Sequence, residues 1–395
     1  MIAVDDAKQL VKTNCHPLSP RELPLEESFN TVLAEDVFSP IDMPGFHQSA
    51  MDGYAICFDD YKQGASLEII AEVQAGANQF PTYQKNTAVR IFTGAPVPAG
   101  YDTVVMQEHT SKENNELFIA SPSLSKGSNV RLQGSEIQEG ELALRQGSLL
   151  TAGAIGFLAS LGFTQIKVHV SPSICILVTG KELQQRGEPL QQGQVYESNS
   201  ITLIAALQQL HFTNIKSVWV DDDPGMMTDQ IKKLLTTCDL LLITGGVSVG
   251  DYDYVTKALD NCGVETIFHR VKQKPGKPLL FGKLGNKVVF GLPGNPSSVL
   301  SCYYQYVTIA LQQLTNRPTA FIKQRQLPIA QSFKKPAGLT HFLKGNYSGA
   351  EVSLLPAQES FRLSSFAIAN CLVEIPEQTA ELKKNDLVSI HILPG

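Results

Sequence analysis

The chain has 395 residues, of which 43% are hydrophobic and 18% charged, and its formal net charge is −6. This length exceeds one ordinary hydrophobic core, so we expect two to four domains of a globular protein. The sequence contains no run of about 18 apolar residues, so we expect no membrane span. The negative charge argues against general nucleic-acid binding. Seven cysteines without a C-x-x-C pair predict reduced thiols in the cytoplasm and no zinc or disulfide framework.

The first 170 residues predict two domains, one inserted in the other. Prolines break up a helical lead-in, where we expect helices over 4–15 and 25–37. Residues 46–130 consist of short β-branched runs separated by Gly, Pro and Asn, which is typical of a small inserted β domain. We expect the flanking pieces, 1–45 and 131–170, to pack together as an N-terminal mixed linker domain.

Residues 171–318 alternate apolar runs of strand length with amphipathic segments of helix length. This alternation predicts a central parallel α/β domain with right-handed crossovers. Asp223 followed by Pro224 marks the start of one of its helices. Residues 319–395 alternate apolar and polar residues over short runs between turns, which predicts a C-terminal β-barrel domain. The fold class is therefore α/β and multidomain.

Three loops of the α/β domain have the composition of anion sites. The apolar run 240–243 ends in Gly245 and Gly246, where glycine lets backbone N–H groups approach a ligand. Lys274 and Lys277 flank a stiff Pro-Gly turn. Asn295-Pro296 predicts a helix start that leads into an apolar helix ending at residue 314, and a helix N-terminus favours an anion.

Carboxylates follow the ends of several predicted strands. Glu182, Asp222 and Asp253 each come after a different strand, and ligands of parallel sheets lie beyond these ends. Three acids in one crevice repel one another unless a cation offsets them, and Mg²⁺ prefers oxygen ligands and phosphate partners. The alternative is that such acids cap helices or are solvent-exposed without a role in the site. We favour this alternative for Asp223, whereas for Asp253 we favour a role in the site.

In order along the chain, these motifs resemble the MoeA family of molybdopterin molybdenumtransferases, to which the gephyrin E domain is related. The motifs that carry the resemblance are SAMDGYA (49–55), TGAP (93–96), TGGVSVG (244–250), KPGKP (274–278) and LPGNP (292–296). The resemblance covers nearly the whole chain. The α/β domain alone also resembles the smaller MogA-type adenylyltransferases, and the insertion and tail favour MoeA.

The resemblance implies the last step of molybdenum cofactor assembly. Molybdate and adenylylated molybdopterin are the implied substrates, with Mg²⁺-dependent release of AMP. It also implies a homodimer whose cleft is shared between the α/β domain of one chain and the inserted β domain of the other, and MogA-like and molybdenum-enzyme partners. The catalytic residues implied are Asp52, Thr93, Glu182, Asp222 and Asp253, of which the last three hold the metal. The substrate- and anion-binding residues implied are Gly245, Gly246, Ser248, Lys274, Lys277, Pro293, Pro296, Ser298, Arg131, Lys344 and Ser365.

Two positions depart from the family pattern. Lys181 stands where relatives have an acid or amide, and Lys344 stands where relatives often have arginine, which keeps the charge and loses the bidentate fork. Two other functions stay open: a MogA-like adenylyltransferase, which makes adenylylated pterin from ATP, and a non-catalytic scaffold that presents the cofactor to partners.

Overall fold

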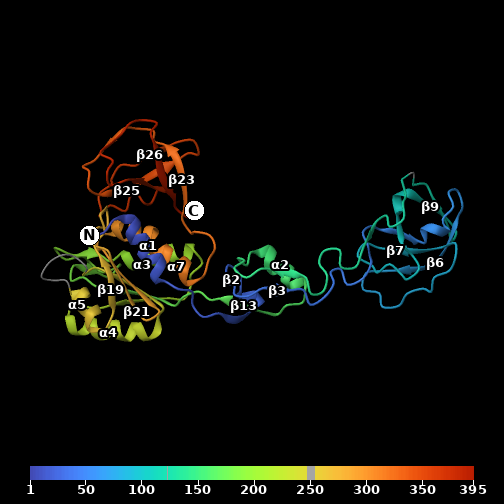
Figure 1. Ribbon diagram of the computed structural model, residues 1–395, viewed down its shortest axis with the longest axis horizontal. Coiled ribbons are helices and arrows are strands. Elements are labelled where there is room, and N and C mark those ends of the chain that lie inside the picture. Colours follow the sequence, from blue (N-terminus) through green and yellow to red (C-terminus); the bar gives the residue numbers. More distant parts are fainter. Residues whose placement is uncertain (122, 247–253) are drawn as a thin grey trace. The chain divides into compact units, whose positions relative to one another are not determined.

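The computed structural model describes residues 1–121, 123–246 and 254–395 (Figure 1). The chain divides into two compact units. The larger unit contains residues 1–34, 147–151 and 166–395, and the smaller unit contains residues 35–146 and 152–165. No helix of the described residues is long and apolar enough to cross a membrane.

A six-stranded sheet forms the centre of the larger unit. Its order is β17 (Ile215–Trp219), β14 (Ile174–Val178), β18 (Leu240–Thr244), β22 (Lys287–Leu292), β21 (Leu280–Leu284) and β19 (Glu265–His269). The first four strands are parallel; β21 runs antiparallel to β22, and β19 runs antiparallel to β21. Every residue of β14 and β18 is buried, as expected for strands covered on both faces.

Helices cover both faces of this sheet. On one face pack α1 (Val4–Asn14), α3 (Asn199–Gln209) and a long helical run, and on the other face pack α4 (Pro224–Thr237) and α5 (Tyr254–Asn261). Asp223 caps α4 through its side chain, and Pro224 takes the first position, as predicted. A short pair, β15 (Leu183–Gln184) and β16 (Val195–Tyr196), precedes α3.

The helical run after β22 contains an irregular turn. It consists of α6 (Pro296–Cys302), a π-helical segment (Tyr303–Val307) and α7 (Thr308–Leu314). The predicted helix up to residue 314 is therefore confirmed. Asn295 takes the N-cap position, but its side chain donates to Ser360 and makes no cap.

The tail forms a second sheet with a core of its own. Its order is β20 (Gln273–Lys274), β25 (Thr340–Tyr347), β27 (Cys371–Ile375), β29 (Leu387–Ile392) and β23 (Lys323–Pro328), with β26 (Val352–Leu354) on β25 and a separate pair β24 (Phe333–Lys334) and β28 (Glu381–Leu382). Since β20 belongs to the lysine turn at 274–277, this turn is attached to the tail sheet.

The N-terminal segment contains one helix and not two. The predicted helix over 25–37 is wrong: a 3₁₀ turn (η1, Leu25–Glu27) leads to β2 (Val32–Leu33) and β3 (Val37–Phe38). Asn30 has a φ of +62°, which ends helical geometry, and the buried β2 pairs with β13 (Gln165–His169). The third strand of this sheet is β1 (Arg21–Pro24).

The smaller unit is built mainly of strands. Its six-stranded sheet has the order β8 (Thr103–Met106), β5 (Gly53–Ile56), β7 (Thr87–Ile91), β6 (Leu67–Val73), β10 (Glu116–Ile119) and β9 (Thr110–Glu113), with 3₁₀ turns η2 (Phe58–Asp60) and η3 (Gln107–His109). Two short pairs, β4 (Gln48–Ser49) with β11 (Val130–Arg131) and β3 with β12 (Leu142–Leu144), join the segments before and after it. Helix α2 (Ala152–Ser160) completes the unit.

Candidate functional site

The lysine turn presents two exposed cations. Lys274 and Lys277 are exposed, and neither side chain makes a hydrogen bond or ion pair with any residue that the structure describes. Between them, Gly276 has a φ of +87°. This left-handed conformation is accessible to glycine at little cost and carries both lysines on one short turn.

Buried side chains hold this turn in place from below. The amide of Gln273, which is fully buried, donates to the carbonyls of Pro275 and Gly276, and the hydroxyl of Tyr306 donates to Oε1 of Gln273. Cys302 packs so closely that a Cβ on Gly276 would lie 2.5 Å from its Sγ. The lysines are therefore exposed charges on a rigid backbone.

A cavity of about 310 Å³ lies beside the turn. Its lining brings the lysine turn together with the start of the helical run and with the tail: Gln273, Lys274, Pro275, Gly276, Lys277, Pro278, Pro293, Asn295, Ser298, Leu339, Gln358 and Ser360. The buried hydroxyl of Ser298 is among these groups. The structure thus brings together four of the predicted anion-binding residues, Lys274, Lys277, Pro293 and Ser298; Pro296 lies next to them in the chain but does not line the cavity.

Lys344 and Ser365 lie in the tail and face inward. Lys344 is 2% exposed, and its ammonium donates to Ser297 Oγ (3.2 Å) and to the carbonyls of Ala357 (2.8 Å) and Arg362 (3.1 Å). Burial lowers the pKa of this lysine. Ser365 donates to the same Ala357 carbonyl at 2.8 Å. All three donors of Lys344 are engaged, so it fixes the 357–365 loop against α6 and does not line the cavity.

An adjoining cavity of about 480 Å³ shares Lys274, Pro275 and Gln358 with the first. His341 on β25 lines it and is buried. Burial, with the nearby charges of Lys335 and Lys274, lowers the pKa of His341 to about 4. Its ring is therefore neutral at pH 7.

The predicted loops lie side by side at the carboxyl edge of the parallel sheet. Val178 lies opposite Thr244, and Thr244 lies opposite Leu292, so the residues that follow each strand meet at one edge. A Cβ on Gly245 would lie 2.3 Å from the Thr179 carbonyl. Glycine is therefore required there by close backbone contact.

The acids at this edge have different surroundings. Asp222 accepts a hydrogen bond from the Thr179 hydroxyl and another from the backbone N–H of Lys181 (3.3 Å). Glu182 is exposed, with its carboxylate packed against Gly180. The predicted residues Ser248 and Asp253 lie outside the described residues. Within the described ranges no group of three or more His, Cys, Asp or Glu side chains is placed to hold a metal ion.

Two polar groups near this edge were missed by sequence reasoning. Asn199, at the start of α3, donates to the Gly294 carbonyl at 2.9 Å, while its buried Oδ1 has no hydrogen-bond partner in the part of the chain that the structure describes. The same holds for the buried hydroxyl of Thr244. A polar cluster before an amphipathic helix, Glu197-Ser198-Asn199-Ser200, was the available signal.

In the smaller unit, the structure brings Asp52 and Thr93 together. These residues flank the paired ends of β5 and β7, and Asp52 Oδ1 accepts hydrogen bonds from the Thr93 N–H (2.7 Å) and hydroxyl (2.9 Å). These bonds, the backbone one first, lower the pKa of Asp52. The carboxylate is therefore charged and held in one orientation.

Arg131 lies elsewhere in the smaller unit. It is exposed, donates to Gln48 Oε1 at 3.3 Å, and lines a cavity of about 530 Å³ with Phe46 and Glu136. Gln48 also donates to the carbonyl of Gly94, the residue after Thr93. Arg131 is thus linked to the Thr93 loop through one side chain.

Residues 2–162 match the MoeA N-terminal region (domain I and II), 175–313 match the probable molybdopterin binding domain, and 326–393 match the MoeA C-terminal region (domain IV). The chain is therefore a multidomain protein whose α/β domain is of the molybdopterin-binding type.

Relatives match over most of the chain. The chain is 32% identical to a molybdopterin molybdenumtransferase of Haemophilus influenzae over 99% of this chain and 98% of that protein. It is 39% identical to one of Nostoc over 72% of this chain and 66% of that protein. A crystal structure of a molybdopterin biosynthesis MoeA protein from Pyrococcus horikoshii superposes with a TM-score of 0.84 at 27% identity and covers both chains completely. The chain belongs to the MoeA family of molybdopterin molybdenumtransferases.

Proposed function

We propose that this enzyme inserts molybdate into adenylylated molybdopterin and releases AMP. The observation that carries the proposal is a pair of lysines at one cavity without a hydrogen-bond or ion-pair partner among the described residues, in a chain whose net charge is −6 and whose family consists of molybdopterin transferases. Molybdate and phosphate are both oxyanions, and a local cluster of cations is what recruits them to an acidic protein.

The lining residues have complementary roles in this proposal. The ammonium groups of Lys274 and Lys277 neutralise the oxyanion, and the Ser298 hydroxyl donates a hydrogen bond to it. Gln273 and Tyr306 act as positioning residues because they fix the turn that carries the lysines. Transfer of this kind depends on positioning and charge rather than on a covalent nucleophile.

Mg²⁺ fits the donor set at the sheet edge. Glu182 and Asp222 offer carboxylate oxygens from loops after neighbouring strands, and Mg²⁺ is usually held by one or two carboxylates together with substrate phosphates and water. When bound, the ion supplies positive charge to the phosphate of the adenylate. Asp222 is oriented for this role by Thr179.

The proposal extends to a cytoplasmic homodimer in which Asp52 and Thr93 of one copy complete the site of the other. The family resemblance supports this arrangement, as does the prealigned, charged Asp52 carboxylate. The product would pass to molybdenum enzymes, with a MogA-like protein as supplier of the adenylylated substrate.

The test is AMP release from adenylylated molybdopterin with and without molybdate. Wild type should require molybdate and Mg²⁺, and Lys277→Ala should need at least tenfold more molybdate, since a hydrogen bond to a charged group contributes about 1.5–3 kcal/mol. Lys233→Ala, an exposed lysine of α4, is the matched control.

Other results would select the alternatives. Pterin binding without AMP release in wild type would indicate a scaffold, and ATP-dependent formation of adenylylated pterin would indicate an adenylyltransferase. Either result overturns the proposal.

A further inference from the structure

The cavity of about 480 Å³ that adjoins the lysine turn is built mainly by the tail. Apart from Lys274 and Pro275, its lining residues come from 333–343 and 357–359, and we call it the tail cavity. It shares a part of its wall with the cavity of about 310 Å³ beside the lysine turn, the lysine cavity. Phe333 and Leu343 give the tail cavity apolar walls, and its volume is that of a small-molecule site.

His341 is the polar group that this cavity exposes to a ligand. Its side chain is 7% exposed and lines the cavity, and it makes no hydrogen bond with any residue that the structure describes. Its ring nitrogens are not among the unpaired atoms that are fully buried, so they are open to the cavity. Because the ring is neutral at pH 7, it can donate one hydrogen bond and accept another.

The charged side chains around the tail cavity are engaged elsewhere, with one exception. Lys334 and Glu359 each lie 3.2 Å from an oppositely charged side chain outside the lining, and the buried Lys335 donates to two backbone carbonyls. Of the charged lining residues, only Lys274 has no such partner in the described part of the chain, and it also faces the lysine cavity. The remaining surface, apolar walls with a neutral imidazole, favours an uncharged heterocycle over a second oxyanion.

The parts of the candidate site follow one another in a fixed order. The loop 293–295 continues from the carboxyl edge of the parallel sheet, where a Cβ on Gly294 would lie 3.8 Å from Cα of Gly245. Two residues of this loop line the lysine cavity, and no described residue of the sheet-edge loops lines the tail cavity. The lysine cavity therefore lies between the sheet edge and the tail cavity.

Adenylylated molybdopterin has its parts in the same order. The dithiolene that receives the metal lies between the pterin rings on one side and the adenylylated phosphate on the other. With the phosphate beside the carboxylates at the sheet edge and the molybdate at the two lysines, the pterin rings extend into the tail cavity. The opposite orientation would place the phosphate away from the carboxylates proposed to hold Mg²⁺.

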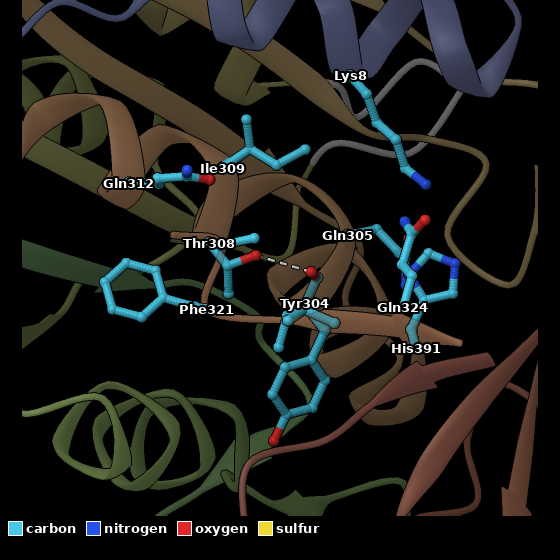
Figure 2. Close-up of a pocket in the computed structure, with 11 residues that line it drawn as sticks. Lys8, Tyr304, Gln305, Thr308, Ile309, Gln312, Phe321, Gln324 and His391 are labelled. Atoms are coloured by element: carbon cyan, nitrogen blue, oxygen red, sulfur yellow. Dashed lines mark hydrogen bonds between the residues drawn. The ribbon is translucent and has the colours of Figure 1, made fainter. Parts of the chain in front are cut away.

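Another cavity of the larger unit does not meet these conditions (Figure 2). Its volume is about 170 Å³, and a cavity of about 150 Å³ holds one benzene molecule, so it is too small for fused rings. Figure 2 shows Lys8 and His391 on one side of it and Phe321 on the other. It shares no lining residue with the lysine cavity or the tail cavity, and the amide of Gln305 in its wall is fully buried.

We propose that the tail cavity holds the pterin rings of adenylylated molybdopterin and that His341 recognises their polar edge through a hydrogen bond. The inference rests on the proposed function, because it assigns one end of that substrate to one cavity. His341 thus selects the organic part of the substrate, while Lys274 and Lys277 select the oxyanion.

The direct test is a fluorescence titration of the full chain with pterin, the ring system without dithiolene or phosphate, in buffer without molybdate. Wild type should bind it saturably. His341→Leu, which fills a similar volume without a polar atom, should weaken binding about tenfold, and His341→Gln, which keeps a donor and an acceptor, should restore most of it. The matched control is His269→Leu, since this histidine of β19 lines neither cavity.

The AMP-release assay separates this inference from the proposed function. His341→Leu should raise the KM for adenylylated molybdopterin about tenfold and leave the molybdate requirement unchanged, and free AMP should not displace bound pterin. The melting temperature verifies that each variant folds. No saturable pterin binding, equal binding by wild type and folded His341→Leu, or displacement of pterin by AMP would overturn the inference. Pterin binding that depends on His341 in a protein that never releases AMP would overturn the proposed function alone.

Discussion

Gly276 offers the sharpest test of how the lysine turn is held. Its φ of +87° costs an L-residue about 1–2 kcal/mol. An added methyl would lie 2.5 Å from Cys302 Sγ and 2.8 Å from Gln273 Nε2, both buried, and such overpacking typically costs about 1–3 kcal/mol more. We therefore expect Gly276→Ala to lose about 2–5 kcal/mol of stability and to displace Lys274 and Lys277 from the cavity.

The assay pairs chemical denaturation with molybdate-dependent AMP release. Gly285→Ala is the matched control in the same unit, because Gly285 also has a positive φ (+58°) but has nothing within 4 Å of the added Cβ. Gly276→Ala should lower the free energy of unfolding by about 1–3 kcal/mol more than Gly285→Ala does. It should also raise the molybdate concentration needed for AMP release, which Gly285→Ala should leave unchanged. Equal losses in the two variants, or unchanged AMP release by folded Gly276→Ala, would refute the reasoning.

Three other predictions concern the tail and the proposed dimer. Lys344→Met should lower the free energy of unfolding by about 2–4 kcal/mol in denaturant titrations, because two buried carbonyls lose a charged donor, and Lys344→Arg should recover little, since the guanidinium does not fit the three acceptors. His341 stays neutral in the folded state down to about pH 4, while the unfolded side chain takes a proton below 6.5. Stability should therefore be full above pH 6.5 and fall by up to about 3 kcal/mol as the pH drops through this window, and His341→Gln should flatten the slope in urea titrations at several pH values. At a molybdate concentration too low for Lys277→Ala, the Asp52→Ala and Lys277→Ala chains should each release little AMP alone and should regain about a quarter of wild-type release when mixed and re-equilibrated if sites are shared between copies, because half of the dimers are then mixed and each has one intact site; no recovery in verified mixed dimers would exclude sharing.

The parts of the site that follow from local sequence were predicted well. Buried parallel strands need near-continuous apolar runs, and such runs predicted the strands at 174–178 and 240–243. The glycines that follow these strands mark where one backbone packs closely against another. The lysine turn was found because Pro275 fixes its own φ and Gly276 can adopt a positive φ, a combination typical of a tight turn. The side chains that hold this turn were not found. Gln273 precedes the turn, whereas Cys302 and Tyr306 lie about 30 residues further on, and only the fold brings them into contact with it.

The longest strand of the tail was missed for a physical reason. β25 reads Thr-His-Phe-Leu-Lys-Gly-Asn-Tyr, and His, Lys and Gly inside it hide the β pattern. Its first six residues are nevertheless buried, because Lys344 finds three acceptors and Gly345 packs against β27 and β26. A buried lysine is recognisable only when its partners are known, and these lie at 297, 357 and 362.

The tail also explains why the α/β domain alone would not build this site. Leu339, Gln358 and Ser360 form one wall of the lysine cavity, and Gln358 is fixed by bonds to the backbone of Lys344 on both sides. β20, which carries Lys274, pairs with β25 and with no strand of the parallel sheet. A chain ending at 318 would keep both lysines and lose the wall and the pairing strand that orient them. The cavity beside the lysine turn is thus formed jointly by the α/β region and the tail, and the proposed metal insertion depends on both.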